Sequence, residues 1–191
     1  MHIISGKFRN IPLITPKGLA TRPTSSQLRA AVFNIVQHSI EEAAFLDLFA
    51  GSGAMGFEAL SRGAKKAIFI ESGREAIKCI RQNAKKLQVE AQCEIYEISV
   101  FTALKKLAER NMAFDIVYAD PPYESQLETQ ESYAQHTLSL LDKDNLIKPE
   151  GVFFLEDAVQ TPIFLDGLVN LSLRNKRKMG RSILYQFVNG K

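Results

Sequence analysis

Between residues 44 and 156, short apolar runs alternate with stretches of helical spacing, and this alternation constrains the fold more than any other feature. Five apolar runs have the length of strands: 44–49, 67–71, 93–97, 114–119 and 151–156. Helical periodicity occupies the stretches 54–62, 73–87, 99–109 and about 126–142. Strands that alternate with helices through short joints indicate a parallel, doubly wound α/β sheet.

The two ends of the chain depart from this alternation. Near the N-terminus, Gly6 and Asn10 separate two short apolar pairs, which predicts a small hairpin or arm followed by a helix that starts near Ser25. Near the C-terminus, two strands are expected at 168–173 and 182–188, joined by a basic loop at 175–181. A terminal antiparallel hairpin brings the predicted sheet to seven strands. We expect an arm and helix over 1–40 and the main domain over 41–191.

The net charge of +3 conceals an uneven distribution. Residues 1–40 carry five basic residues and no acid, and residues 174–191 carry six basic residues and no acid. The segment between them has a net charge of −8, since 13 basic residues there accompany all 21 acids. Basic ends around an acidic body favour a polyanionic partner such as nucleic acid, although a solvated basic face would give the same pattern.

Composition and cysteine usage favour a protein of the cytosol. The two cysteines, Cys79 and Cys93, have neither metal-ligand nor redox spacing, and we expect both to be core residues. The N-terminal segment lacks the layout of a signal peptide, and no apolar run approaches the length of a membrane span. No metal site is expected, because His2, His38 and His136 have no ligand spacing. Nothing in the sequence requires more than a monomer.

A glycine-rich segment follows the first predicted strand and predicts a cofactor site. In open α/β sheets, ligands bind at the carboxyl ends of the strands. Glycines there allow a tight turn and a close approach to a ligand. At the end of the second strand, Glu71 is placed to accept hydrogen bonds from both hydroxyls of a ribose. A nucleoside-containing cofactor is therefore expected on Asp47, Phe49, Ala50, Gly51, Ser52, Gly53, Glu71 and Ser99.

The carboxylate of Asp47 favours one of two classes of cofactor. The spacing Gly51, Gly53, Gly56 also fits the GxGxxG of dinucleotide enzymes, a weak signal when alone. A pyrophosphate gains nothing from a nearby carboxylate, whereas the ammonium of S-adenosylmethionine does. Ser99 stands where such enzymes usually have an acid near the adenine amine, and its hydroxyl still accepts a hydrogen bond.

The fourth predicted strand runs directly into Asp120-Pro121-Pro122-Tyr123, which indicates methylation of an exocyclic base amine. Such an amine is a poor nucleophile because its lone pair is delocalised into the ring. Asp120 and the Pro121 carbonyl would each accept one amine hydrogen, and the prolines hold the loop rigid. Tyr123 offers a face on which a flipped-out base can stack. Positioning and fixed electrostatics then supply much of the catalysis.

These motifs together resemble the bacterial RsmD family of 16S rRNA guanine-N2 methyltransferases. The resemblance covers nearly the whole chain, and its most specific part is Arg22-Pro23-Thr24 with Arg29 ahead of the first strand. It also includes Ile3-Ile4-Ser5-Gly6-Lys7, the run from Glu58 to Ala64, and Lys178-Met179-Gly180-Arg181. Ala30, Gly73 and Ser99 depart from the family pattern, which affects details of cofactor affinity.

The resemblance implies a Rossmann-like class I methyltransferase fold. It also implies S-adenosylmethionine as donor and guanine 966 of 16S rRNA, in the small ribosomal subunit, as acceptor. RNA contacts are expected from Arg9, Lys17, Arg22, Thr24, Arg29, Lys178 and Arg181. Arg22, Thr24 and Arg29 have an alternative role, in which they hold the methionine carboxylate of the cofactor.

Several other functions agree with part of the pattern. A DNA adenine-N6 methyltransferase needs the same amine acceptors, but 191 residues leave no room for a target-recognition region. Another RNA or a protein amine is also a conceivable substrate. A non-catalytic ribosome-assembly factor would keep the fold but would not need Asp120-Pro121-Pro122-Tyr123. A nicotinamide-dependent reductase would fit the glycine spacing alone.

Overall fold

The computed structural model describes residues 1–16, 26–122, 131–159 and 163–190, which form two compact units, Met1–Val100 and Phe101–Lys191. The first unit contains the N-terminal arm (residues 1–16) and the elements α1 (Ser26–Ile35), β1 (Ala44–Leu48), α2 (Ala54–Ser61), β2 (Lys66–Ile70), α3 (Arg74–Leu87), the short 3-10 helix Glu90–Gln92 and β3 (Cys93–Tyr96). The second contains nearly all of α4 (Val100–Glu109), then β4 (Phe114–Ala119), α5 (Tyr133–Lys143), β5 (Ile147–Ala158), β6 (Leu171–Met179) and β7 (Ser182–Asn189).

In the first unit the strands are parallel, in the order β3-β2-β1. All five residues of β1 are buried, as are the last four of β2. Strands that are buried on both faces are typical of a parallel sheet covered by helices, and they explain why these segments form continuous apolar runs in the sequence. The carboxyl ends of β1 and β2 therefore lie at the same edge, which brings the glycine loop after β1 next to Glu71 after β2.

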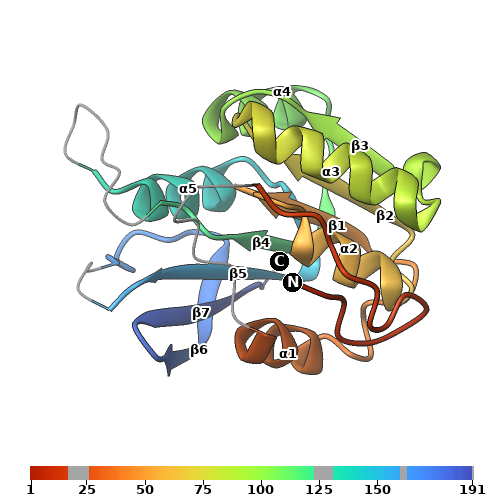
Figure 1. Ribbon diagram of the computed structural model, residues 1–191. Coiled ribbons are helices and arrows are strands. Elements are labelled where there is room, and N and C mark those ends of the chain that lie inside the picture. The colour runs from red at the N-terminus through yellow and green to blue at the C-terminus, as the bar shows by residue number, and fades with distance from the viewer. Residues whose placement is uncertain (17–25, 123–130, 160–162, 191) are drawn as a thin grey trace. The chain divides into compact units, whose positions relative to one another are not determined.

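In the second unit, β4 and β5 are parallel, and β5, β7 and β6 follow as antiparallel neighbours (Figure 1). Helix α5 packs on β5 and is capped at its N-terminus by Ser132, whose hydroxyl accepts the Gln135 N–H. The helix predicted from residue 126 thus starts at 133, and residues 126–130 lie outside the described part of the chain.

The expected basic loop at 175–181 is wrong, because β6 continues through it to Met179. Only Gly180 and Arg181 connect the two strands, and Gly180 has the positive φ of 65° that a two-residue hairpin turn requires. The charges of this segment lie on the strand that ends the order β4-β5-β7-β6. Lysines and arginines are common on such strands because they prevent edge-to-edge association.

The described residues form seven strands, mainly parallel and ending in an antiparallel hairpin, which confirms the predicted fold class. The boundary predicted at residue 40 stays a prediction. The N-terminal arm is indeed a small hairpin, since His2 and Pro12 form an antiparallel bridge and Ile3 donates to the Ile11 carbonyl at 3.0 Å. Within the residues that the structure describes, no helix is long and apolar enough to span a bilayer.

Candidate functional site

The glycine loop after β1 is the centre of the candidate site in the first unit. Phe49, Gly51 and Gly53 all have positive φ, at 56°, 55° and 78°. A Cβ on Gly53 would approach the Phe57 ring to 2.7 Å, and one on Gly56 would approach the Phe69 ring to 2.2 Å. A Cβ on Gly51 would meet nothing within 4 Å. Packing thus requires two of the glycines, whereas Gly51 faces open space where a ligand can approach.

Glu71 ties the glycine loop to the turn after β2. Its carboxylate accepts the Gly51 N–H at 2.7 Å through one oxygen, and the Ser72 and Gly73 N–H groups at 2.9 and 2.7 Å through the other. A carboxylate offers about four lone-pair sites, so Glu71 keeps acceptor capacity for a further donor. The side chain is half-buried, which leaves it accessible from solvent.

Asp47 lies within β1 and is only 1% exposed. It accepts the Gly56 N–H at 2.9 Å, in the first turn of α2. Burial raises the pKa of Asp47 well above its usual value, and the negative charge of Glu71 raises it further, against the lowering effect of the Gly56 hydrogen bond. An ionised Asp47 therefore carries an uncompensated energetic cost that a cationic ligand would offset.

We expect Asp47→Asn to change how stability depends on pH. Because the folded-state pKa is raised, the contribution of Asp47 to wild-type stability falls as pH rises from about 4, where the unfolded carboxyl ionises, until the folded carboxyl ionises too. The asparagine Oδ1 still accepts the Gly56 N–H but does not titrate. Urea unfolding at several pH values should show the variant gaining stability relative to wild type across this window. A difference that is constant with pH would contradict the raised pKa.

Ser99 is the remaining predicted cofactor residue of the first unit. It is exposed and precedes α4, three residues beyond the end of β3. Direct hydrogen bonds join Glu71 to Gly51 of the loop Phe49–Gly53, and Asp47 to Gly56 just after that loop. Ser99 follows β3, and the Tyr96 carbonyl at the end of that strand accepts the Glu71 N–H at 3.2 Å.

In the second unit, Asp120 and Pro121 directly follow β4, as the sequence predicts. Asp120 is half-buried, Pro121 buried and Pro122 exposed, and Tyr123 lies outside the described residues. Two residues before Asp120, the buried Tyr118 hydroxyl donates to Glu156 Oε2 at 2.7 Å, and this hydrogen bond joins β4 to β5. The next residue, Asp157, has its pKa raised to about 6 by burial. Among the described residues, no three histidine, cysteine or acidic side chains gather as a metal site.

The family described as "Conserved hypothetical protein 95" matches residues 1–188. The chain belongs to this family. The resemblance to the RsmD family is confirmed. The Haemophilus influenzae protein named ribosomal RNA small subunit methyltransferase D is 33% identical over 166 residues, which is 85% of this chain and 81% of that protein.

Solved structures agree with the fold. The yhhF protein of Escherichia coli has 29% identity and a TM-score of 0.79, and the match covers 99% of this chain and 97% of the yhhF chain. An RNA methyltransferase from Salinibacter ruber, solved with S-adenosyl-L-homocysteine, has 17% identity and a TM-score of 0.64, covering 88% of this chain and 94% of its own. At that identity, the second likeness concerns the fold alone.

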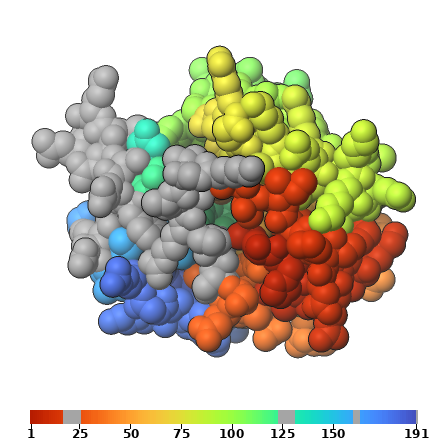
Figure 2. All heavy atoms as spheres, viewed as in Figure 1, coloured from red at the N-terminus to blue at the C-terminus, as the bar shows by residue number. Residues whose placement is uncertain are grey.

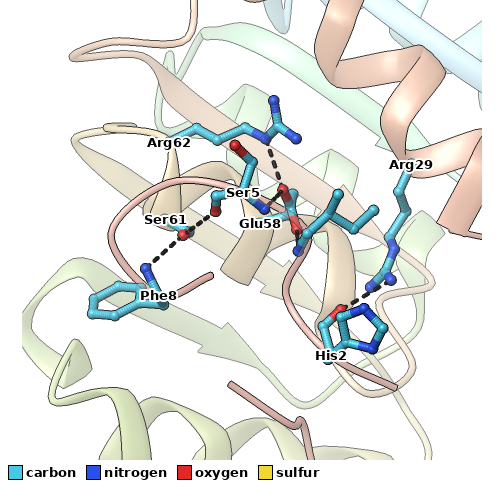
Figure 3. Close-up of polar contacts among 8 residues, drawn as sticks. His2, Ser5, Phe8, Arg29, Glu58, Ser61 and Arg62 are labelled. Carbon is cyan, nitrogen blue, oxygen red and sulfur yellow. Dashed lines mark hydrogen bonds and ion pairs between the residues drawn. The ribbon is translucent and has the colours of Figure 1, made fainter. Parts of the chain in front are cut away.

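The N-terminal arm of this Conserved hypothetical protein 95 member is fixed to α2 by groups whose role the sequence did not reveal (Figure 3). Glu58 is fully buried and accepts the Ile4 and Ser5 N–H groups at 2.7 and 3.0 Å, as well as Arg62 Nε at 2.7 Å. The Ser61 hydroxyl accepts the Phe8 N–H at 2.9 Å. In Figure 1 the red arm accordingly runs beside the orange α2.

The residues expected to contact RNA have different environments. Arg9, Lys178 and Arg181 are exposed, whereas Lys17, Arg22 and Thr24 lie outside the described residues. Arg29 is only 2% exposed, and its guanidinium donates to the His2 carbonyl at 3.1 Å. This contact ties α1 to the arm (Figure 3). The expected contact of Arg29 with RNA, or with the methionine carboxylate, stays a prediction.

Proposed function

We propose that this protein transfers a methyl group from S-adenosylmethionine to the exocyclic N2 amine of a guanine in 16S rRNA, with guanine 966 as the target. The substrate would be the small ribosomal subunit, the second product S-adenosylhomocysteine, and the place of action the cytoplasm. The protein would act as a monomer and without a metal. Family membership and the names of relatives, among them small-subunit rRNA methyltransferases, support the substrate class.

The observation that carries the proposal is the position of Asp120-Pro121-Pro122 immediately after β4. Ligands of open α/β sheets bind at this end of the strands. Asp120 would accept one hydrogen of the target amine, and the Pro121 carbonyl would accept the other. With both hydrogens held, the nitrogen lone pair is directed away from the ring. Asp120 is also a candidate to take the released proton, and Tyr123 would stack on the base.

The glycine loop of the first unit, with Asp47 and Glu71, fits the proposed methyl donor. Gly51 faces open space, Glu71 keeps capacity to accept one ribose hydroxyl donor, and Phe49, Ala50, Ser52 and Gly53 form the loop around Gly51. The ammonium of the methionine moiety would offset the desolvation that raises the pKa of Asp47. Ser99 would accept from the adenine amine. When bound, the cofactor supplies an electrophilic methyl group on its sulfonium.

Exposed basic side chains on the arm and on the β6–β7 hairpin would meet phosphates: Arg9 on the former, Lys178 and Arg181 on the latter. The same role remains proposed for Lys17, Arg22 and Thr24. Contacts of this kind position a protein on RNA without reading its sequence. Recognition of the particular guanine would then come from RNA shape and base contacts near Asp120.

Replacing Lys178 and Arg181 together by alanine should weaken binding to small subunits and flatten its dependence on salt. For single strands, removing one side chain that neutralises a phosphate lowers the slope of log affinity against log salt by about 0.7. Filter binding from low to moderate salt measures the slope. The control, Lys105→Ala with Lys106→Ala, removes two exposed charges of α4 and should leave the slope unchanged. Equal slopes for the hairpin variant and wild type would mean that the β6–β7 hairpin does not contact RNA phosphates.

The deciding experiment is tritium transfer from labelled S-adenosylmethionine to small subunits from cells that lack the modification. Digestion and nucleoside chromatography should yield N2-methylguanosine, and primer extension should map it to guanine 966. Duplex DNA is offered in parallel. Label in N6-methyladenine of DNA and none in the subunits would refute the rRNA assignment.

A further inference from the structure

Asn83 of α3 is a fully buried amide that joins two segments far apart in the sequence. Its Oδ1 accepts the Ile14 N–H at 2.8 Å, and its Nδ2 donates to the Ile14 carbonyl at 2.9 Å. The same Nδ2 donates to the Ser52 carbonyl at 3.2 Å. Ile14 belongs to the N-terminal arm, and Ser52 lies between Gly51 and Gly53 in the glycine loop. In Figure 2 the red atoms of the arm cover the surface next to the yellow atoms of α3.

The chemistry of this contact requires an amide of this length. An asparagine has one acceptor and two donor hydrogens, and here it serves an N–H and two carbonyls. An aspartate at the same position would keep the acceptor but would present negative charge to two carbonyl oxygens. An apolar side chain would remove the partner of three backbone groups, and the loss is most costly at the buried Ser52 carbonyl. The role of Asn83 is therefore not that of an ordinary helix residue.

The glycine loop needs such support because its backbone is unusual. Three of its residues have positive φ, and one of these is Phe49, for which that conformation is unfavourable. Such conformations persist only where the surroundings enforce them. Glu71 holds Gly51 from one side, and Asn83 holds Ser52 from another.

We infer that Asn83 is a positioning residue that makes arm docking part of the cofactor site, because it holds the arm and the glycine loop through one side chain. This inference rests on the proposed function for the identity of the ligand. The arm is docked independently on α2 by Glu58 and Ser61. Undocking the arm therefore loosens the glycine loop and weakens cofactor binding.

The test uses the full-length protein, with S-adenosylhomocysteine as the probe. Asn83→Asp should raise its Kd about tenfold or more, as expected for the loss of the two hydrogen bonds that the Asn83 amide donates. The matched control is Asn189→Asp, since Asn189 is also buried and donates to the Ile147 carbonyl at 2.7 Å in the second unit. That variant should lose stability and keep its Kd within about twofold of wild type, a difference below the size of one hydrogen bond.

A second variant tests the coupling between the arm and the glycine loop by a change in the arm itself. Gly6 has φ 80°, and a Cβ there would lie 1.9 Å from the Ser61 carbonyl oxygen, so Gly6→Ala must displace the arm. If Asn83→Asp does not fold, this variant decides the question. We expect a raised Kd here too. An unchanged Kd in Gly6→Ala, or an equal rise in Asn189→Asp, would overturn the inference.

Hydrogen exchange separates this inference from the proposed function. The Gly51 and Gly53 N–H groups donate to Glu71 and to the Ala50 carbonyl, and both should exchange faster in Asn83→Asp and Gly6→Ala. This measurement needs no ligand. Wild-type protein that fails to bind S-adenosylhomocysteine would refute the cofactor assignment, while exchange at these amides would still decide the coupling. Unchanged exchange in both variants would overturn it.

Discussion

Asp120→Ala should reduce methyl transfer to small subunits by at least a factor on the order of 10²–10³, the cost of removing one positioned group that stabilises the transition state. The amine lone pair is unreactive while it is conjugated with the ring, and in the proposed site the remaining acceptor, the Pro121 carbonyl, would hold only one of the two hydrogens. The Kd for S-adenosylhomocysteine should stay close to that of wild type, because we assign cofactor binding to Asp47 and Glu71. Single-turnover transfer and ligand titration measure the two quantities separately.

Asp115→Ala is the matched control for this experiment. Asp115 lies near the start of β4, the strand that Asp120 follows, and its carboxylate binds Lys148 Nζ at 2.8 Å. Both variants remove one half-buried carboxylate from β4 or its end, so a difference in transfer between them reports the position of the carboxylate. Transfer by Asp115→Ala should remain near the wild-type rate. An active Asp120→Ala enzyme would show that another group accepts the amine hydrogen.

Glu58→Ala should cause the largest loss of stability among the substitutions considered. Removing a fully buried carboxylate leaves the Ile4 and Ser5 N–H groups and the Arg62 guanidinium without their partner. Breaking a buried ion pair by removing one partner costs about 3–5 kcal/mol. In a chain of this size that lowers the melting temperature by roughly 6–20 °C. Circular dichroism during thermal unfolding measures the change.

The control for Glu58 is Glu75→Ala, which also breaks a helical ion pair. Glu75 binds Lys78 at 2.5 Å, but both side chains are about two-thirds exposed. Exposed pairs of this kind contribute little, because water and salt already screen the charges. The melting temperature should be nearly unchanged. Similar losses in the two variants would mean that the arm contacts of Glu58 do not stabilise the fold.

The spacing of apolar residues predicted most of the helices and strands, because burial requires apolar side chains at regular intervals along each of them. In β1 and β4 the apolar runs coincide with the strands to within a residue. The misplaced loop at 175–181 shows where this reasoning fails. A strand at the edge of a sheet has one side without a strand neighbour, so Lys176, Arg177 and Lys178 are compatible with it, and charge by itself does not indicate a loop.

The residues of the candidate site could be predicted only where their role produces a pattern among neighbouring residues of the sequence. Asp47 lies near the end of β1, Gly51 follows β1 and Glu71 follows β2, so the topology alone places them at one edge. Asn83 and Glu58 serve backbone groups about 70 and 50 residues away, and no local pattern encodes such partners. Arg29 did carry a signal, because it lies three and four residues before Val32 and Phe33, on the apolar face of α1.

The hydrogen bonds between the arm and α2 have a consequence for the order of folding. Residues 4–8 bond to partners 53–56 residues further along, so during synthesis the arm emerges well before the helix that receives it. Until then its N–H groups are satisfied by water. Because closing so long a loop costs entropy before the contacts form, the arm should dock late and contribute little to the folding transition state. Substitutions at Glu58 would then speed unfolding more than they slow folding.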